Sequence, residues 1–393
     1  MKDLLTMFMF QRIIILLIFL CISLSLCSPS KAYFENPVIS NFTYHDASLI
    51  QGEDGFFYSF VSSVVPRESA MAYYTVSIFK SGNLINWCFD KYAFEDKYIE
   101  KRLVNGYDKK HVFWGKYPYH LGGKTTHYAI WAPDIFKFRN KYYLFVSFHL
   151  SVSDTKIAVF ESDSINKDFK FLQILVSSNK EDGDYYVDTE ELIDPFPITV
   201  GRETYLMYGS FRRDSGGKWL PKRLKMGVYI SQLKMKNGKF TLGKRIFVTD
   251  YYEGCMVIPH GGKFWLLGTN GSLLNSTYKI DYAVTDRITG PYLNRIGKAI
   301  SDTINFNPGT PILKTTANQR FNGFGCPSNP IIDKNGQYWL MMHGHAKEFS
   351  PIQMEKAEQE RYTFLIPLYW DKDGSPYFDM DEIQNNRIAY PVL

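Results

Sequence analysis

The sequence predicts an all-β fold, a five-bladed β-propeller with four-stranded antiparallel blades. The chain of 393 residues contains 30 Phe and 28 Tyr, and both residue types favour strands. From residue 33 onward, short apolar and aromatic runs alternate with turns rich in Gly, Asp, Asn and Lys, and no long helical periodicity interrupts them. A pattern of strand, tight turn and aromatic strand recurs five times along the chain.

The first 32 residues stand apart from this pattern. Lys2 and Arg12 precede the apolar run IIILLIFLCISLSL at residues 13–26, and Ser30 and Ala32 have the spacing that a signal peptidase accepts. The run is short for a membrane-spanning helix. We therefore predict a cleaved secretory signal peptide over residues 1–32 and a secreted or periplasmic protein without a stable membrane partner. An uncleaved membrane anchor is the alternative.

Residues 33–393 are predicted to form a single catalytic domain, because nothing in this range resembles a linker. The polar stretches 92–127 and 172–190 are interpreted as long surface loops. The net charge of +5 is small for the length and shows no basic block, which argues against nucleic-acid binding. Beyond the leader only Cys88, Cys255 and Cys326 remain; they form no disulfide framework, although one disulfide stays open.

The repeat has a defined spacing. Four of its copies place an aromatic residue 11 positions after the start, and a looser fifth copy begins near Pro327. The four pairs are Asp46 and Phe57, Trp131 and Tyr142, Asp194 and Tyr205, and Glu253 and Phe264. The intervals between copies, about 60 to 80 residues, hold four strands of ordinary length. Radial repetition of such units is typical of a β-propeller.

Three of the repeat positions carry acids: Asp46, Asp194 and Glu253. A single Asp at such a place is usually a turn residue. In a propeller, however, the first strand of each blade lines the central axis, so equivalent starting positions converge at one end. Hydrolysis of a glycosidic bond needs a general acid and a base or nucleophile, and a third carboxylate can raise the pKa of the acid. The sequence therefore predicts a glycosidase centre on the axis.

Taken in order, the motifs HDASLI, WAPDIF, IDPF and YEGC resemble those of glycoside hydrolase family 43, whose fold is a five-bladed propeller. SGNLINW (81–87), YAVTDRITGPY (282–292) and LYWDKDGSPYF (368–378) are also similar to segments of that family. The resemblance extends over about residues 36 to 380.

The resemblance implies a role for each acid. Asp46 would be the general base that activates water, Glu253 the general acid, and Asp194 the residue that adjusts the pKa of Glu253 and holds its orientation. The reaction would invert the anomeric configuration, with base and acid about 6.5–9.5 Å apart. The substrates would be arabinofuranosyl or xylosyl linkages in plant-type polysaccharides or oligosaccharides.

Further site residues follow from the same comparison. His45, Trp131 and His343 are predicted to contact substrate, although each could instead pack within the fold, and Asp134 is expected to be structural. Family members with a central metal histidine carry GxGH in blade five, where this chain has GFGCPS and therefore Cys326. We accordingly expect no required cofactor and assign no metal ligand; a central calcium ion is the alternative.

Two other functions remain open on the sequence alone. One is a β-fructosidase-like propeller enzyme, which would retain configuration and carry a fuller NDPNG signal in blade one; HDASLI fits that signal poorly. The other is a propeller that binds glycans without cutting them, which would have no need of three converging acids.

Overall fold

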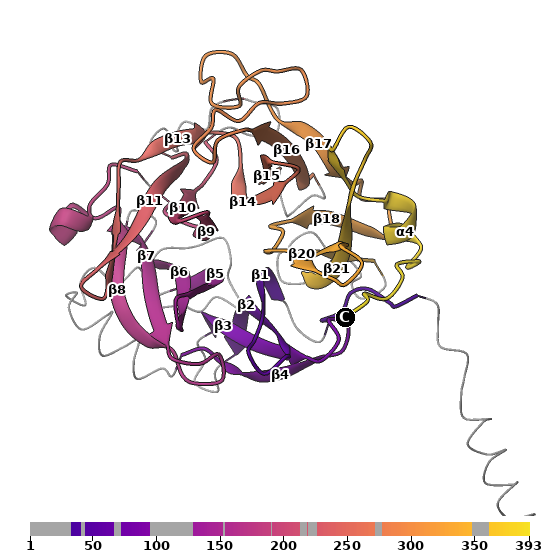
Figure 1. Cartoon of the computed structure of the whole chain (residues 1–393), viewed down its shortest axis with the longest axis horizontal. Helices are drawn as coiled ribbons and strands as arrows, with labels where there is room; N and C mark the ends of the chain where they lie inside the picture. Colours follow the sequence, from indigo (N-terminus) through magenta and orange to yellow (C-terminus); the bar gives the residue numbers. More distant parts are fainter. Residues whose placement is uncertain are drawn as a thin grey trace, which may run out of the picture.

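The computed structural model describes residues 33–40, 44–66, 72–94, 129–151, 154–189, 191–212, 218, 226–271, 277–347 and 361–393. In this part of the chain, five small antiparallel blades surround a central axis, and one parallel pairing, Tyr74 with Ala129, joins the first two blades into a continuous sheet (Figure 1). The predicted five-bladed propeller is confirmed. The predicted signal peptide, residues 1–32, lies outside the described residues.

The blades follow one another in chain order. Blade one consists of β1 (Tyr44–Gln51), β2 (Phe57–Pro66), β3 (Ala72–Ser81) and β4 (Trp87–Tyr92). Blade two consists of β5 (Ala129–Phe138), β6 (Lys141–Ser151), β7 (Asp154–Ser162) and β8 (Lys170–Ser177). Blade three consists of β9 (Phe196–Val200), β10 (Glu203–Gly209), β11 (Val228–Lys236), β12 (Lys239–Leu242) and β13 (Ile246–Thr249).

The last two blades complete the ring. Blade four consists of β14 (Glu253–His260), β15 (Lys263–Asn270), β16 (Lys279–Thr285) and β17 (Thr310–Lys314). Blade five consists of β18 (Phe321–Gly325), β19 (Ile331–Ile332), β20 (Tyr338–Ala346), β21 (Tyr362–Trp370) and β22 (Pro376–Tyr377). A 3-10 helix, η3 (Lys180–Tyr185), follows blade two, and a short helix, α4 (Met380–Gln384), follows blade five.

The two ends of the described chain close the ring. Ile39 pairs with Thr363 of β21, and the Phe34 amide donates to the Ile388 carbonyl over 3.1 Å. The Asn36 side chain adds a buried bond of 2.9 Å to the Leu365 carbonyl. Because these residues lie more than 300 positions apart in the sequence, the contacts fix blade one beside blade five. Figure 1 shows the carboxyl end lying at the same junction.

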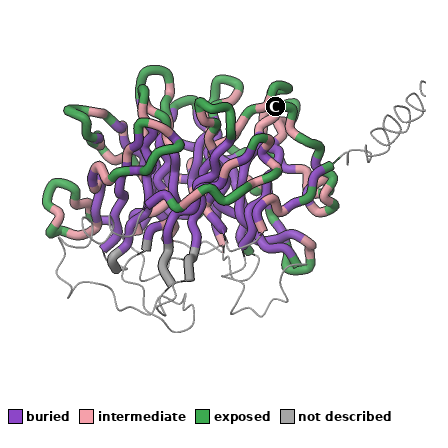
Figure 2. Tube along the Cα trace, turned by 90° about the horizontal axis from the view of Figure 1, so that it is seen from below, coloured by how far each residue is buried: buried purple, intermediate pink, exposed green. Residues whose placement is uncertain are grey.

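The core lies within and between the blades. Strands are buried along most of their length, whereas exposed residues gather in the turns (Figure 2). Phe60, Leu144 and Leu206 on the second strands of the first three blades are fully buried. Burial of such a side chain contributes on the order of 1.5–3 kcal/mol to the stability of the fold. Apolar packing within and between the blades therefore stabilises their arrangement around the axis.

Part of the region predicted as a long surface loop is a strand. The interpretation of residues 172–190 as one long loop is wrong at its start, because Lys170–Ser177 form β8, the outer strand of blade two. The sequence KFLQILVS borders a polar region, yet it pairs with β7.

Cys88, Cys255 and Cys326 are all free thiols. Among the described residues, no helix has the length and apolar character needed to cross a membrane.

Candidate active site

Each blade carries a residue with a positive φ within or directly beside its innermost strand. These residues are Asp46 (50°), Ala132 (43°), Asp194 (52°), Gly254 (55°) and Cys326 (48°). In blades one, two and four the strand register shifts at this residue, which marks a β-bulge; in blade five the shift lies between Asn322 and Gly325, just before Cys326. Bulges re-aim side chains and are frequent next to active sites. The five positive-φ residues therefore mark equivalent points of the five blades.

A side chain of the preceding blade accepts the backbone N–H of each of these residues. The donor and acceptor pairs are Ala132 to Ser62 Oγ (2.7 Å), Asp194 to Ser147 Oγ (3.1 Å), Gly254 to Asp194 Oδ2 (2.8 Å), Cys326 to Thr269 Oγ1 (2.9 Å) and Asp46 to His343 Nδ1 (3.4 Å). The backbone N–H of the positive-φ residue in each blade therefore has a hydrogen-bond acceptor. Asp194 and His343 consequently hold the ring together as well as facing the axis.

The positive-φ positions change the alignment of the sequence repeat by one residue in blades two and four. The 11-residue count aligned Trp131 and Glu253 with Asp46, but the equivalent residues are Ala132 and Gly254. The count fails because the hairpin of blade one is one residue longer: Ser48 pairs with Phe60, 12 residues on, whereas in blade three Phe196 pairs with Met207, 11 residues on. Glu253 therefore precedes the bulge position that Asp46 and Asp194 occupy.

Asp46 is held between two histidines. Its Oδ2 lies 2.6 Å from His45 Nδ1 and accepts from Ser62 Oγ over 3.1 Å, while its Oδ1 lies 3.4 Å from His343 Nδ1. Burial alone would raise the pKa of Asp46, but the adjacent His45 and the contacts with both imidazole rings outweigh burial and hold that pKa well below its usual range. Asp46 is therefore a carboxylate at neutral pH.

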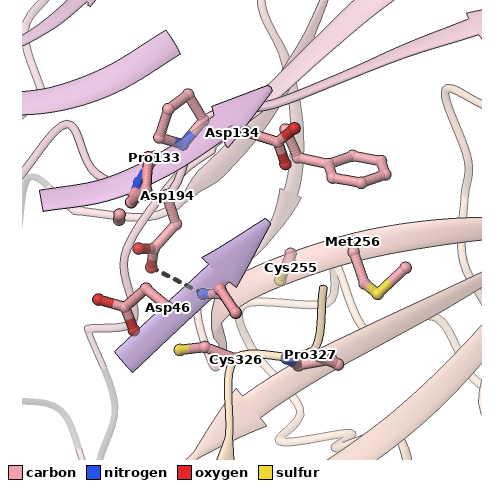
Figure 3. A pocket seen from close by; sticks show the side chains of 13 residues that line it. Asp46, Pro133, Asp134, Asp194, Cys255, Met256, Cys326 and Pro327 are labelled. Atoms are coloured by element: carbon pink, nitrogen blue, oxygen red, sulfur yellow. Dashed lines mark hydrogen bonds between the residues drawn. The ribbon is translucent and has the colours of Figure 1, made fainter. Parts of the chain in front are cut away.

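Asp194 has the opposite electrostatic environment. Its carboxyl group lies beside that of Asp46 and accepts the Gly254 N–H, as the dashed line in Figure 3 shows. Burial, followed by the negative charges of Glu253 and Asp46, raises the pKa of Asp194 well above its usual range. Repulsion between the carboxylates therefore disfavours the state in which all three acids are ionised.

Glu253 begins β14 and joins the same cluster. The Tyr278 hydroxyl donates to its Oε1, and Ser210 Oγ lies 3.4 Å from its Oε2. Its charge raises the pKa of Asp194, which places the two carboxyl groups in electrostatic contact. The separation of 6.5–9.5 Å between base and acid stays a prediction.

The other residues singled out in the sequence lie around this cluster. His45 and His343 are buried against Asp46, so they reach the centre through its carboxylate. Trp131 is half-buried and packs on His149, with ring centroids 4.3 Å apart. Asp134 accepts from Ser48 and from Asn329, both over 3.2 Å; it thus links blades one, two and five, as expected of a structural residue.

A small pocket opens at the cluster. The residues that line it are Asp46, Ala47, Ala132, Pro133, Asp134, Asp194, Pro195, Phe196, Gly254, Cys255, Met256, Cys326 and Pro327. They come from the innermost segments of all five blades, and the side chains converge in Figure 3. The pocket therefore presents the carboxyl groups of Asp46, Asp134 and Asp194 on a wall of mixed polar and apolar character, whereas Glu253 is not among its lining residues.

One group of pocket residues could hold a cation. Asp46, Cys326 and His343 each offer one ligand atom, and these atoms lie within 4.8 Å of one another. Calcium prefers six to eight oxygen ligands. A set with one carboxylate, one thiol and one imidazole does not suit it, so this cluster does not fit a calcium ion.

Sequence reasoning missed Ser62, Ser210 and Tyr278. Ser62 lies within β2 and Ser210 directly after β10, and a single serine at either place carries no distinguishing signal. Tyr278 precedes β16 and lies 25 residues after Glu253. The antiparallel pairing of β14, β15 and β16 brings the two side chains together.

Known proteins are similar to this chain over most of its length. The family model described as Glycosyl hydrolases family 43 matches residues 34–376. The extracellular exo-alpha-(1->5)-L-arabinofuranosidase ArbA of Cellvibrio japonicus is 22% identical over 327 residues, which cover 79% of this chain and 82% of the relative. The extracellular endo-alpha-(1->5)-L-arabinanase 1 of Bacillus subtilis is 25% identical over 278 residues, which cover 70% of this chain and 74% of the relative.

Solved structures show the same fold. An alpha-L-arabinanase of Cellvibrio cellulosa, complexed with arabinohexaose, has a TM-score of 0.61 at 17% identity and covers 89% of this chain and 98% of that chain. An endo-arabinanase of Bacillus licheniformis has a TM-score of 0.60 at 19% identity and covers 88% and 99%. Because the family model spans nearly the whole propeller, this chain is a glycosidase and belongs to glycosyl hydrolase family 43.

Proposed function

We propose that this protein hydrolyses α-L-arabinofuranosyl linkages with inversion, with Asp46 as general base, Glu253 as general acid and Asp194 as the residue that adjusts and orients Glu253. The observation that carries the proposal is the division of charge within one cluster. The surroundings of Asp46 keep it ionised, whereas burial and neighbouring carboxylates raise the pKa of Asp194. A cluster that separates pKa values in this way can hold an ionised base beside a protonated carboxyl group. The choice of Glu253 rather than Asp194 as the acid rests on the resemblance of the motif YEGC to that of the family.

The reaction follows from these protonation states. Asp46 takes a proton from water as the water oxygen attacks the anomeric carbon. Glu253 gives its proton to the glycosidic oxygen, and the bond between that oxygen and the anomeric carbon breaks. Repulsion within the cluster helps retain the proton that Glu253 must deliver. Afterwards Asp46 loses its proton to solvent and Glu253 regains one, which restores the starting state.

The choice of sugar rests on the relatives. Both curated relatives are named for alpha-(1->5)-L-arabinose linkages, one as an exo- and one as an endo-acting enzyme, and a structural neighbour binds arabinohexaose. Arabinan-type plant polysaccharides and oligosaccharides are therefore the proposed substrates, ahead of xylosides. Both relatives are also named extracellular, which supports secretion by way of the leader at residues 1–32.

A substrate panel tests the proposal. We expect hydrolysis of linear α-1,5-arabinan and aryl α-L-arabinofuranosides, and little or none of aryl β-xylosides and sucrose. Proton NMR of the first sugar released should show the anomer opposite to that of the substrate. Release of the same anomer would contradict inversion, and turnover of xylosides alone would contradict the choice of sugar.

Catalysis is expected to continue without a divalent cation. Prolonged treatment with EDTA should change kcat on an aryl arabinofuranoside by less than about twofold, since acid–base hydrolysis needs only the carboxyl groups. The control is the same enzyme with added CaCl₂, which should also show no change. A loss that calcium restores would show that a cation takes part.

A further inference from the structure

Tyr278 occupies a place in the cluster that none of the roles above uses. It immediately precedes β16 and is 3% exposed. Its hydroxyl donates to Glu253 Oε1 and lies 3.9 Å from Cys326 Sγ. Its ring stacks on that of His343, with centroids 5.6 Å apart and an interplanar angle of 18°. The side chain is therefore fixed from both sides while its only acidic proton faces the predicted acid.

We propose that Tyr278 is the positioning residue that determines which oxygen of Glu253 carries the catalytic proton. This inference rests on the proposed role of Glu253 and extends it. A carboxylic acid bears its proton on one oxygen only. Oε1 accepts the short hydrogen bond from the Tyr278 hydroxyl, whereas Oε2 accepts only the long bond of 3.4 Å from Ser210 Oγ. The stronger donor makes Oε1 the carbonyl oxygen, so the proton resides on Oε2.

Tyr278 also favours the transition state. As Glu253 transfers its proton to the leaving oxygen, it gains negative charge, and a hydrogen bond to a charged acceptor is about twice as strong as one to a neutral acceptor. The bond therefore strengthens during the step it assists, which is the condition for acceleration. Burial, together with Cys326 and Glu253, raises the pKa of Tyr278 well above its usual range, so the phenol remains a donor at every working pH.

The stack on His343 connects the acid to the base. His343 Nδ1 lies 3.4 Å from Asp46 Oδ1, so a continuous set of contacts runs from Glu253 through Tyr278 and His343 to Asp46. Movement of the Tyr278 ring would disturb both carboxyl groups. A rigid ring therefore fixes the acid relative to the base.

Tyr278→Phe tests the hydroxyl while keeping the ring. We expect kcat/KM on arabino-oligosaccharides, whose leaving group is an unactivated alcohol, to fall about 10- to 100-fold. For 2,4-dinitrophenyl arabinofuranoside, whose leaving group needs no proton, we expect less than threefold. The basic limb of the pH–rate profile should move to higher pH, because a carboxyl group that loses a donor ionises less readily.

The matched control is Tyr282→Phe, on the strand β16 that begins directly after Tyr278. Its hydroxyl donates to Ser375 Oγ over 3.3 Å and takes no part in the cluster. This variant should show neither the leaving-group dependence nor the shift of the basic limb. In the background of Glu253→Ala, the Tyr278→Phe change should have no further effect, because the group that it positions is absent. An equal loss for both leaving groups, or additive losses in the double variant, would overturn the proposal.

A measurement without substrate separates this inference from the proposed function. Carbon NMR of ¹³C-labelled glutamate, with the Glu253 signal assigned by its absence in Glu253→Gln, follows the ionisation of that carboxyl group directly. In Tyr278→Phe its midpoint should rise relative to wild type, and in Tyr282→Phe it should not. An unchanged midpoint would refute the hydrogen-bond role even in an enzyme active on arabinan, and a raised midpoint would support it even if the natural substrate is another glycoside.

Discussion

Replacing Asp46 by Ala is expected to lower kcat on every arabinofuranoside by about 10⁴-fold, the upper range of what a positioned general base contributes. The loss should not depend on the leaving group, because water must be activated whichever aglycone departs. Azide needs no deprotonation and should restore turnover of an activated aryl arabinofuranoside. The product of the rescued reaction should be the arabinosyl azide of inverted configuration, which NMR identifies.

Asp134→Asn is the matched control for this variant. Asp134 lines the same pocket, and burial raises its pKa well above the usual range, so an amide resembles its neutral form. Its hydrogen bonds with Ser48 and Asn329 link blades, and we expect a lower melting temperature with kcat changed by less than about fivefold. If Asp134→Asn lost as much activity as Asp46→Ala and Asp46→Ala resisted azide, the base would have been assigned to the wrong acid.

The wild-type pH profile provides a second check on Asp46. A base acts only when ionised, so activity falls on the acidic side as the pH drops through its pKa. His45 and His343 hold the pKa of Asp46 well below its usual range. The acidic limb of kcat/KM should therefore lie below the pKa of an ordinary Asp, near 3.9. Replacing His45 by Ala removes the contact with Oδ2 and should move this limb to higher pH.

The architecture could be predicted from the sequence because the repeat is visible in the order and spacing of residue types. Strand, turn and aromatic strand recur with similar spacing, and the acids lie at or next to the same point of each copy. The register of the bulge could not be predicted. It depends on one extra residue in the hairpin of blade one, which shifts Asp46 against Phe57 without changing the pattern of residue types.

The contacts that complete the site were beyond sequence reasoning for a different reason. Ser62, Thr269 and His343 accept backbone groups from the following blade, and these pairings exist only once the ring has closed. Gly254 is a further example. A Cβ at this position would lie 2.7 Å from Cys326 Sγ, in addition to requiring φ of 55°. Its need for glycine becomes visible only when blade five stands beside it.

Replacing Glu253 by Ala should separate the two halves of the reaction. On arabino-oligosaccharides we expect at least a ~10³-fold loss in kcat/KM, because the departing alkoxide must be protonated as the bond breaks. On 2,4-dinitrophenyl arabinofuranoside the loss should be under about tenfold, since that phenolate leaves unaided. The basic limb of the pH profile should also disappear, because the group that must be protonated is gone.

The exposed Glu203 supplies the matched control. It lies in blade three, where it accepts from Tyr205 and Gln232 away from the axis, and Glu203→Ala should leave both substrates unaffected. A Glu253→Ala variant that lost both substrates equally while keeping the wild-type melting temperature would show that Glu253 does not donate the proton. Asp194, whose surroundings raise its pKa, would then be the carboxyl group to test as the acid, because it is the remaining member of the cluster that holds a proton.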